Sequence, residues 1–149
     1  MRYLQVEDMR DLAYGAAILG TGGGGDPYIG MLLAEQVIRE YGPVKLVGLD
    51  EIDDDAFSAS VAYVGAPVVM IEKLLGFADM VKAFQSLERY MGRKFTAVIS
   101  AEIGGANSIV PVSVAAALNL PLIDADGMGR AYPEIPLVTW TLHGISATP

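Results

Sequence analysis

Four segments of the chain carry apolar residues at every third or fourth position, which is the spacing of an amphipathic helix. They predict helices over 6–19, 28–41, 76–91 and 109–118. Each helix is followed by a residue that commonly terminates helices, namely Gly20, Gly42, Gly92 and Asn119. For the last helix we expect Pro111 in the first turn and Asn107 or Ser108 as the N-cap.

Short runs of apolar and β-branched residues lie between and after these helices. They predict strands over 44–49, 60–67, 95–100, 121–124 and 137–145. Because strands alternate with helices, we expect one α/β domain over 1–149, with a mostly parallel or mixed sheet flanked by helices in Rossmann-like layering. Ligands of such sheets bind beyond the carboxyl ends of the strands, so the loops there are candidate sites.

Composition narrows the classes of partner. The chain has 149 residues, of which 52% are hydrophobic and 19% charged, and its net charge is −8. This charge argues against nucleic acids and anionic membranes, because both are bound through clustered Lys and Arg. The apolar runs are too short to span a membrane and the first residues lack a signal-peptide pattern, so we expect a cytoplasmic protein. The acidic run 50–55 is typical of a solvated turn.

The chain has no cysteine and a single histidine, His143. Thiolate nucleophiles, disulfides and cysteine-based zinc sites are therefore excluded within this chain. Any hydrolytic or lyase chemistry has to use carboxylates, hydroxyls, backbone N–H groups or a partner chain. We expect His143 to be an ordinary strand residue.

A glycine-rich loop, LGTGGGGDPY, occupies 19–28. Glycine is costly to order, so such a run indicates close approach of a ligand to the backbone, although a tightly packed connector between two helices is the alternative. Backbone N–H groups at the start of a helix attract a carboxylate, a phosphate or a developing oxyanion, while Pro27 suits the first helical position. The candidate substrate-binding residues of this loop are Thr21, Gly22, Gly23, Gly24, Gly25 and Asp26, of which Asp26 also suits the helix cap.

Two further loops follow predicted strands. The loop 101–108 places Glu102 directly after a strand and offers Asn107 as donor and acceptor, although Asn107 as a simple cap fits equally well. In the loop 124–134, Asp124 and Asp126 are one residue apart, so an extended backbone projects both to the same side. We therefore expect Glu102, Asp124 and Asp126 to be the catalytic carboxylates, with the two aspartates as candidate ligands of a possible divalent metal. Arg130 is expected to bind an anionic substrate group, with a local Asp–Arg ion pair as the alternative.

Two other functions remain open. The stretch Gly20–Gly25 formally matches the dinucleotide fingerprint G-x-G-x-x-G, and Asp50 follows the next predicted strand, where an acid binds the ribose. That motif requires a strand before the loop, whereas 6–19 has the pattern of a helix. The second alternative is a non-catalytic domain that assembles through apolar surface, which a mean hydropathy of +0.40 allows.

The three loops GTGGGGDP, EIGGAN and DADGMGRAYPE, followed by HGISATP, occur in this order along nearly the whole chain. Together they resemble the S-methyl thiohydantoin desulfurase family, a hydantoinase-like domain of unknown function. The resemblance implies the N-terminal α/β domain of a larger hydrolase or desulfurase, which removes a sulfur substituent from a thiohydantoin ring.

The family's chains continue into a second, β-rich domain after the segment that corresponds to 147–149. We therefore expect a small-molecule substrate, and either homo-oligomerisation or pairing with a C-terminal domain. On a cyclic amide, the glycine-loop N–H groups would stabilise negative charge on the ring. A carboxylate, Asp124, Asp126 or Glu102, would activate water directly or through a bound metal.

Overall fold

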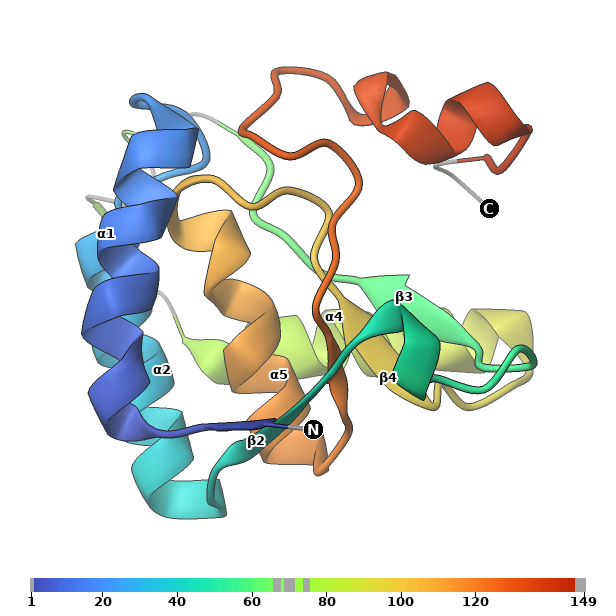
Figure 1. Cartoon of the computed structure of the whole chain (residues 1–149), viewed down its shortest axis with the longest axis horizontal. Helices are drawn as coiled ribbons and strands as arrows, with labels where there is room; N and C mark the ends of the chain where they lie inside the picture. The colour runs from blue at the N-terminus through green and yellow to red at the C-terminus, as the bar shows by residue number, and fades with distance from the viewer. Residues whose placement is uncertain (1, 66–67, 69–71, 74–75, 147–149) are drawn as a thin grey trace.

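The computed structural model describes residues 2–65, 68, 72–73 and 76–146. Its centre is a five-stranded sheet with the strand order β1-β2-β5-β4-β3 (Figure 1). The strands are β1 (Arg2–Leu4), β2 (Val44–Val47), β3 (Ser58–Ser60), β4 (Ala97–Ile99) and β5 (Leu122–Ile123). Strands β2, β5, β4 and β3 run parallel, and only β1 pairs antiparallel, at one edge. The predicted α/β class with a mostly parallel sheet is confirmed.

Helices occupy the segments that the apolar spacing predicts. They are α1 (Met9–Gly20), α2 (Pro27–Tyr41), α4 (Phe77–Met91) and α5 (Val110–Leu118). At the start of α2, the side chain of Asp26 accepts a hydrogen bond from the Tyr28 N–H, as expected of an N-cap. Helix α4 ends at Gly92 and α5 ends at Asn119, both in the left-handed conformation that commonly terminates helices.

The core lies mainly between the helices and one face of the sheet. Its large cluster takes side chains from all four helices and from alternate strand positions such as Val44, Val98 and Leu122. The intervening strand residues Val47 and Ile123 belong to a smaller cluster on the other face. Helix α5 packs against both α2 and α4 and is buried from Val110 to Ala116, which explains why it is apolar on every side.

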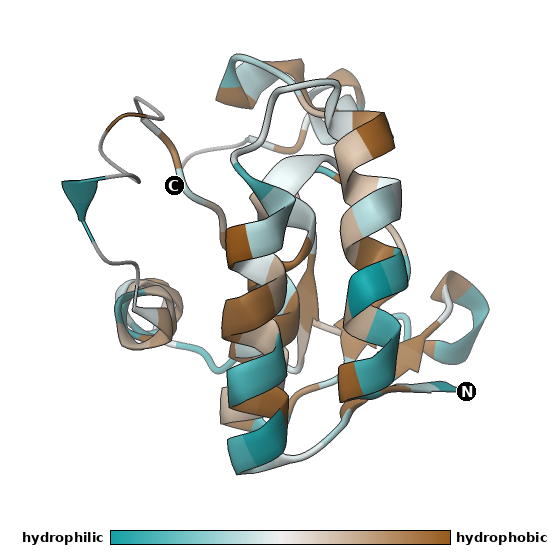
Figure 2. Cartoon of the chain, turned by 90° about the vertical axis from the view of Figure 1, so that its left-hand side faces the viewer, coloured by the Kyte–Doolittle hydropathy of each residue, from teal (hydrophilic) through white to brown (hydrophobic). Residues whose placement is uncertain are grey.

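Helices α1 and α2 form the outer wall of the molecule that faces the viewer in Figure 2. Their inner positions are buried, whereas Tyr14, Ile18 and Leu32 expose apolar side chains. Among the described residues, no helix has the length and apolar character needed to cross a membrane.

Two of the strands predicted from the sequence are wrong. The strand expected over 60–67 lies earlier, at β3, and 61–65 have no regular structure, while 66–67 lie outside the described residues. The strand expected over 137–145 is replaced by two short 3-10 helices, η4 (Ile135–Leu137) and η5 (Thr139–His143). Here the Thr141 hydroxyl donates to the backbone oxygens of Pro136 and Val138, a local bonding pattern that competes with strand pairing.

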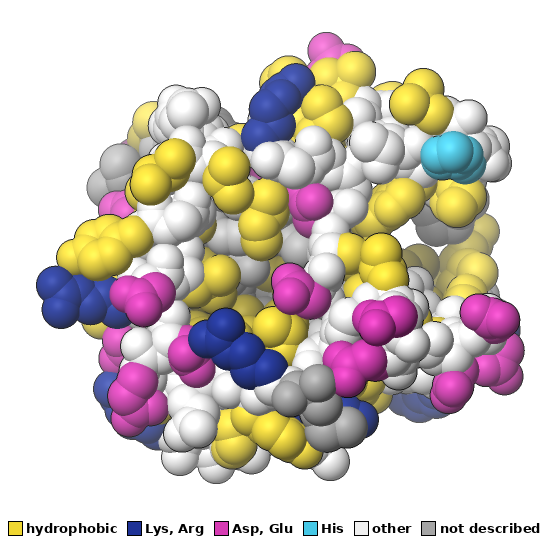
Figure 3. Space-filling model, viewed as in Figure 1, with side chains coloured by type: hydrophobic (Ala, Val, Ile, Leu, Met, Phe, Trp, Pro, Cys, Tyr) yellow, Lys and Arg dark blue, Asp and Glu magenta, His cyan; other side chains and the backbone are white. Residues whose placement is uncertain are grey.

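The expected cap of the last helix is also wrong. Asn107 and Ser108 lie inside a 3-10 helix, η3 (Gly105–Ser108), and Ile109 is the N-cap of α5. The Ser108 hydroxyl donates to the Gly105 carbonyl, and the Asn107 amide bonds to more distant segments described below. The other 3-10 helices are η1 (Val6–Asp8) and η2 (Leu49–Glu51), and η2 opens the exposed acidic turn that the sequence predicts. Acidic side chains gather over this part of the surface in Figure 3.

Candidate functional site

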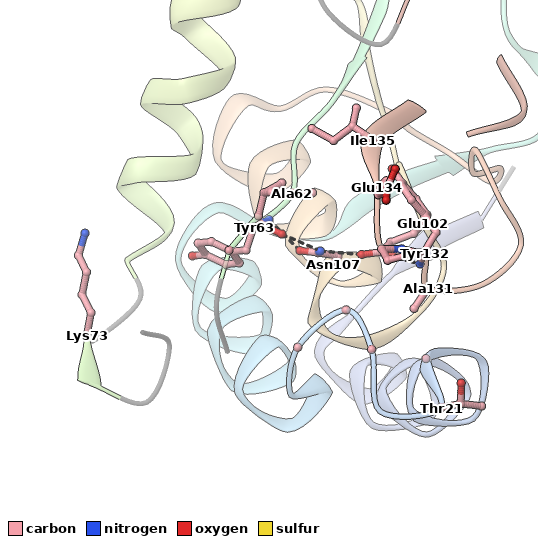
Figure 4. Close-up of a pocket in the computed structure, with 17 residues that line it drawn as sticks. Thr21, Ala62, Tyr63, Lys73, Glu102, Asn107, Ala131, Tyr132, Glu134 and Ile135 are labelled. Carbon is pink, nitrogen blue, oxygen red and sulfur yellow. Dashed lines mark hydrogen bonds between the residues drawn. The ribbon is translucent and has the colours of Figure 1, made fainter. Parts of the chain in front are cut away.

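A pocket of about 650 Å³ lies beyond the carboxyl ends of β3, β4 and β5 (Figure 4). Its walls come from four places: the glycine-rich loop, the segment Ala62–Gly65 after β3, the residues Glu102 and Asn107 after β4, and the segment Ala131–Ile135 after β5. Lys73 borders the pocket as well, apart from the other labelled side chains. The volume suits a small organic ligand, and the position is the one that parallel sheets commonly offer.

The glycine-rich loop is held against η3 by backbone contact. A Cβ atom on Gly24 would collide with the Gly104 carbonyl, and one on Gly105 would collide with Gly23 and Gly24. The Ala106 N–H donates to the Gly25 oxygen at 3.1 Å, and the Asn107 N–H donates to the Gly24 oxygen at 3.1 Å. Part of the glycine run is therefore required for packing, as the connector interpretation expects.

The other side of this loop presents unused N–H groups. Because the N–H of a trans peptide points opposite to its carbonyl, the N–H of Gly25 points away from η3. Within the described residues, no group accepts a hydrogen bond from the N–H of Gly24 or Gly25, and both glycines line the pocket. These two N–H groups therefore have no protein acceptor in the described part of the chain, and the substrate-binding role of the loop stays a prediction.

Glu102 is the buried carboxylate of the pocket, with an exposed fraction of 5%. Its Oε1 accepts a hydrogen bond from Asn107 Nδ2 at 2.7 Å, and its Oε2 accepts one from the Tyr132 N–H at 2.9 Å. The Tyr132 ring lies near this carboxylate, and burial together with the negative charges of Glu102 and Asp126 raises the pKa of its hydroxyl. Tyr132 therefore remains a neutral hydrogen-bond donor at physiological pH.

The remaining candidate residues divide into two groups. Thr21, Gly23, Gly24 and Gly25 line the pocket, together with Glu102 and Asn107. Gly22, Asp26, Asp124, Asp126 and Arg130 are not among its lining residues. The Arg130 guanidinium is exposed and donates to the Ala131 oxygen.

The two aspartates have different surroundings. Asp126 Oδ2 accepts the backbone N–H groups of Ile103, Met128 and Gly129, so this carboxylate fixes the turn that follows β5. The Asp124 side chain is exposed. Among the described residues, no group of three or more Asp, Glu or His side chains is placed to hold a metal ion. The catalytic and metal-binding roles of Asp124 and Asp126 stay predictions.

Several lining residues were not candidates from the sequence, and two of them take part in the hydrogen bonds of the site. Tyr63 and Tyr132 both contribute backbone groups to the pocket's hydrogen bonds. Tyr132 belongs to the conspicuous stretch 124–134, whereas Tyr63 falls in a segment that has the pattern of a strand. Because Tyr63 contributes through its main chain, no side-chain pattern could have identified it.

The structural context does not fit a dinucleotide site. The glycine-rich loop joins α1 to α2, so a helix and not a strand precedes it. Asp50 lies in η2, is exposed and does not line the pocket. The formal G-x-G-x-x-G match is therefore a consequence of the glycine run itself.

Comparisons with known proteins agree with the fold and cover nearly all of the chain. A protein-family model described as S-Me-THD-like, N-terminal domain, matches residues 7–149. The chain is also similar to a protein from Chromobacterium violaceum known from an X-ray crystal structure, with 32% sequence identity and a TM-score of 0.76. This similarity covers 97% of the present chain but only 40% of the other, which is a much longer protein. Comparison with the curated proteins gives no match.

Proposed function

The chain belongs to the family of S-Me-THD-like N-terminal domains, and from this premise we propose that its pocket binds a small cyclic amide of the hydantoin or thiohydantoin type. One observation carries the proposal: the buried carboxylate Glu102 lines the same pocket as Gly24 and Gly25, whose N–H groups have no acceptor among the described residues. A ring of this type has an N–H group next to a carbonyl. It therefore needs one acceptor and one donor side by side.

In this proposal the ring N–H, or a water molecule, donates to Glu102, and the glycine loop donates to the ring oxygen or nitrogen. Attack of water on the ring carbon builds negative charge on that oxygen or nitrogen. In known oxyanion holes one well-aimed donor contributes about 3–4 kcal/mol of transition-state stabilisation. Tyr132 and Thr21, which both carry a hydroxyl group, also line the pocket.

For a ring with a methylthio substituent the proposed step is hydrolytic. The water oxygen forms a bond to the ring carbon while Glu102 accepts the proton of that water. The bond from carbon to sulfur then breaks, and the thiolate leaves with the proton that Glu102 returns. The second proton of the water moves from the new hydroxyl to the ring nitrogen, which leaves a carbonyl at the ring carbon. The products are the ring carbonyl compound and a thiol, so no oxidant or reductant is needed.

The experiment is a calorimetric titration of the chain with hydantoin, 2-thiohydantoin and an S-methyl thiohydantoin. Saturable binding of at least one ring is expected, and Glu102→Gln is expected to weaken it about tenfold or more, since hydrogen bonds to charged groups contribute about 1.5–3 kcal/mol. The matched control is Glu134→Gln, because Glu134 also lines the pocket but is exposed. Equal effects of the two variants, or no binding of any ring, would contradict the proposal.

A further inference from the structure

The side-chain amide of Asn107 is fully engaged with the protein. Its Oδ1 accepts the Tyr63 N–H at 2.8 Å, and its Nδ2 donates to the Tyr63 oxygen at 3.0 Å and to Glu102 Oε1 at 2.7 Å. An asparagine amide has two N–H groups, and both are used here. Asn107 is 6% exposed. It therefore has no N–H left for a ligand, although the sequence predicts a substrate-binding role for it.

The surroundings fix the orientation of this amide. If its nitrogen and oxygen were exchanged, the NH₂ group would face the Tyr63 N–H, and the oxygen would face the Tyr63 oxygen and the Glu102 carboxylate. The first contact would set a donor against a donor, and the others would set an acceptor against an acceptor. One orientation alone satisfies all three contacts, so Asn107 holds Glu102 in a defined position.

A continuous chain of hydrogen bonds joins two walls of the pocket through these residues (Figure 4). It begins at the backbone of Tyr63 in the Ala62–Gly65 wall, passes through Asn107 to one oxygen of Glu102, and continues from the other oxygen to the Tyr132 N–H. Asn107 makes no hydrogen bond with Tyr132 itself. Any effect of Asn107 on Tyr132 along this chain must pass through Glu102.

We propose that Asn107 is a positioning residue, which fixes the Glu102 carboxylate between the two walls and couples the wall at Tyr63 to the wall at Tyr132. Its functional meaning rests on the proposed function, in which Glu102 contacts the ring. The coupling itself is a property of the free protein. It can therefore be tested without a ligand.

The test uses NMR to measure hydrogen–deuterium exchange at individual backbone amides. The ligand-free Asn107→Ala variant is compared with the ligand-free parent chain. The Tyr63 N–H loses its acceptor directly, so its faster exchange is uninformative. The Tyr132 N–H is informative, and we expect it to exchange about fivefold faster or more, the change that corresponds to a net hydrogen bond of about 1 kcal/mol. The Ala106 N–H, bonded to Gly25, serves as the internal control and should be unchanged.

A second variant moves the carboxylate instead of removing it. In Glu102→Gln/Asn107→Asp, the amide at 102 donates to the carboxylate at 107, while its oxygen still accepts the Tyr132 N–H. We expect this swap of groups to slow the hydrogen–deuterium exchange of the Tyr132 N–H relative to Asn107→Ala, although an oxygen at 107 then faces the Tyr63 oxygen and holds that wall less firmly than the parent does. The single variant Asn107→Asp should not, because it places two carboxylates against each other.

The outcomes separate the inference from the proposed function. Unchanged exchange at Tyr132 in Asn107→Ala overturns the inference, since Asn107 would then only anchor the segment at Tyr63. If Asn107→Ala does not fold, the double variant decides in its place, and loss of cooperative unfolding in both variants also overturns it. Hydantoin binding is measured in parallel: the double variant should bind hydantoin about tenfold more weakly than the parent, despite the slowed exchange of its Tyr132 N–H. If the parent chain binds no hydantoin while the exchange results hold, the proposed function fails and the positioning role stands.

Discussion

At position 24 the backbone leaves no room for a side chain. Gly24 has a positive φ of 76°, and a Cβ atom there would collide with the Gly104 carbonyl. Gly22, two residues earlier, also has a positive φ, of 96°, but a Cβ atom there would meet nothing within 4 Å. The two glycines thus separate the cost of backbone conformation from the cost of packing.

We expect Gly24→Ala to lower the free energy of unfolding more than Gly22→Ala does. Both variants pay about 1–2 kcal/mol for a left-handed residue, and Gly24→Ala should lose a further 1–3 kcal/mol or so through the forced displacement of Gly104. Urea denaturation followed by circular dichroism measures both. Equal losses would mean that the loop does not pack on η3 as described.

The Asp126 carboxylate is a structural residue of its turn, whatever further role it has. Removing it in Asp126→Ala leaves three backbone N–H groups without their acceptor, and we expect a loss of about 1–3 kcal/mol of unfolding free energy. Asp124→Ala is the control, since the Asp124 side chain is exposed, and should change stability little. A larger loss in Asp124→Ala than in Asp126→Ala would contradict this assignment.

At the scale of elements, Glu88 connects the last turn of α4 to the segment that leads into β4. Its carboxylate accepts the Lys94 ammonium at 2.7 Å and the buried Phe95 N–H at 3.1 Å. Burial alone would raise the pKa of Glu88, but these hydrogen bonds outweigh burial and leave its pKa below the ordinary value. Between the lowered pKa and the ordinary one, the unfolded chain binds more protons than the folded chain.

Glu88 therefore stabilises the fold fully above the ordinary glutamate pKa of about 4.3, and this contribution is lost as the pH falls toward the lowered pKa. As the pH falls from about 5 to 3, we expect the free energy of unfolding to decrease less steeply in Glu88→Gln than in the parent chain. Urea denaturation at a series of pH values measures this slope. Glu7→Gln, at an exposed position, controls for the change of one charge, and an unchanged slope in Glu88→Gln would contradict the assignment.

The helices could be predicted because their apolar spacing and their terminal glycines and asparagine are local signals. The segment 137–145 could not, since its alternation of apolar residues with threonine is the same for a strand and for the 3-10 helices that the Thr141 hydroxyl supports. Strand β1 (Arg2–Leu4) was missed because its sequence carries no strand pattern of its own. Its pairing with β2 is a tertiary contact that no local pattern encodes.

The candidate site, like the fold, could be predicted from the sequence only in part. Glu102 was found because loops after parallel strands converge at one edge of the sheet, and the glycine loop was found because a run of glycines is itself a signal of close approach to the backbone. The sequence also singled out the Asp124 and Asp126 pair on spacing alone. Spacing does not reveal that Asp126 turns to the backbone of Ile103, far away along the chain.

At the scale of the whole molecule, the net charge of −8 acts on any charged ligand. Glu102 and Glu134 line the pocket, with Lys73 as the one cation among its described lining residues. We expect a hydantoin with a carboxylate substituent to bind about two- to tenfold more weakly than the same ring with a carboxamide at low salt. The difference in affinity between the two ligands should become smaller at about 1 M salt, where charges are screened within roughly 3 Å. Tighter binding of the ring with the carboxylate would contradict this expectation.

The expected homo-oligomer, or pairing with a C-terminal domain, stays a prediction. The similar protein from Chromobacterium violaceum is a longer chain, and the outer face of α1 and α2 exposes Tyr14, Ile18 and Leu32 here. Exposed apolar side chains on one face favour contact with another protein surface, so we expect self-association that grows with concentration. Size-exclusion chromatography over a wide concentration range measures it, and a strictly monomeric chain would contradict the homo-oligomer.

The most direct test of the central claim is an NMR titration of the isotopically labelled chain with hydantoin, following the backbone N–H signals of the glycines. If the loop donates to a ring held by Glu102, the signals of Gly24 and Gly25 move downfield and saturate with the ligand, and this response is lost in Glu102→Gln. The signal of Gly42, which is bonded to Ile38 at the end of α2, stays in place. Saturable binding that leaves Gly24 and Gly25 unmoved, or that persists unchanged in Glu102→Gln, would contradict the account.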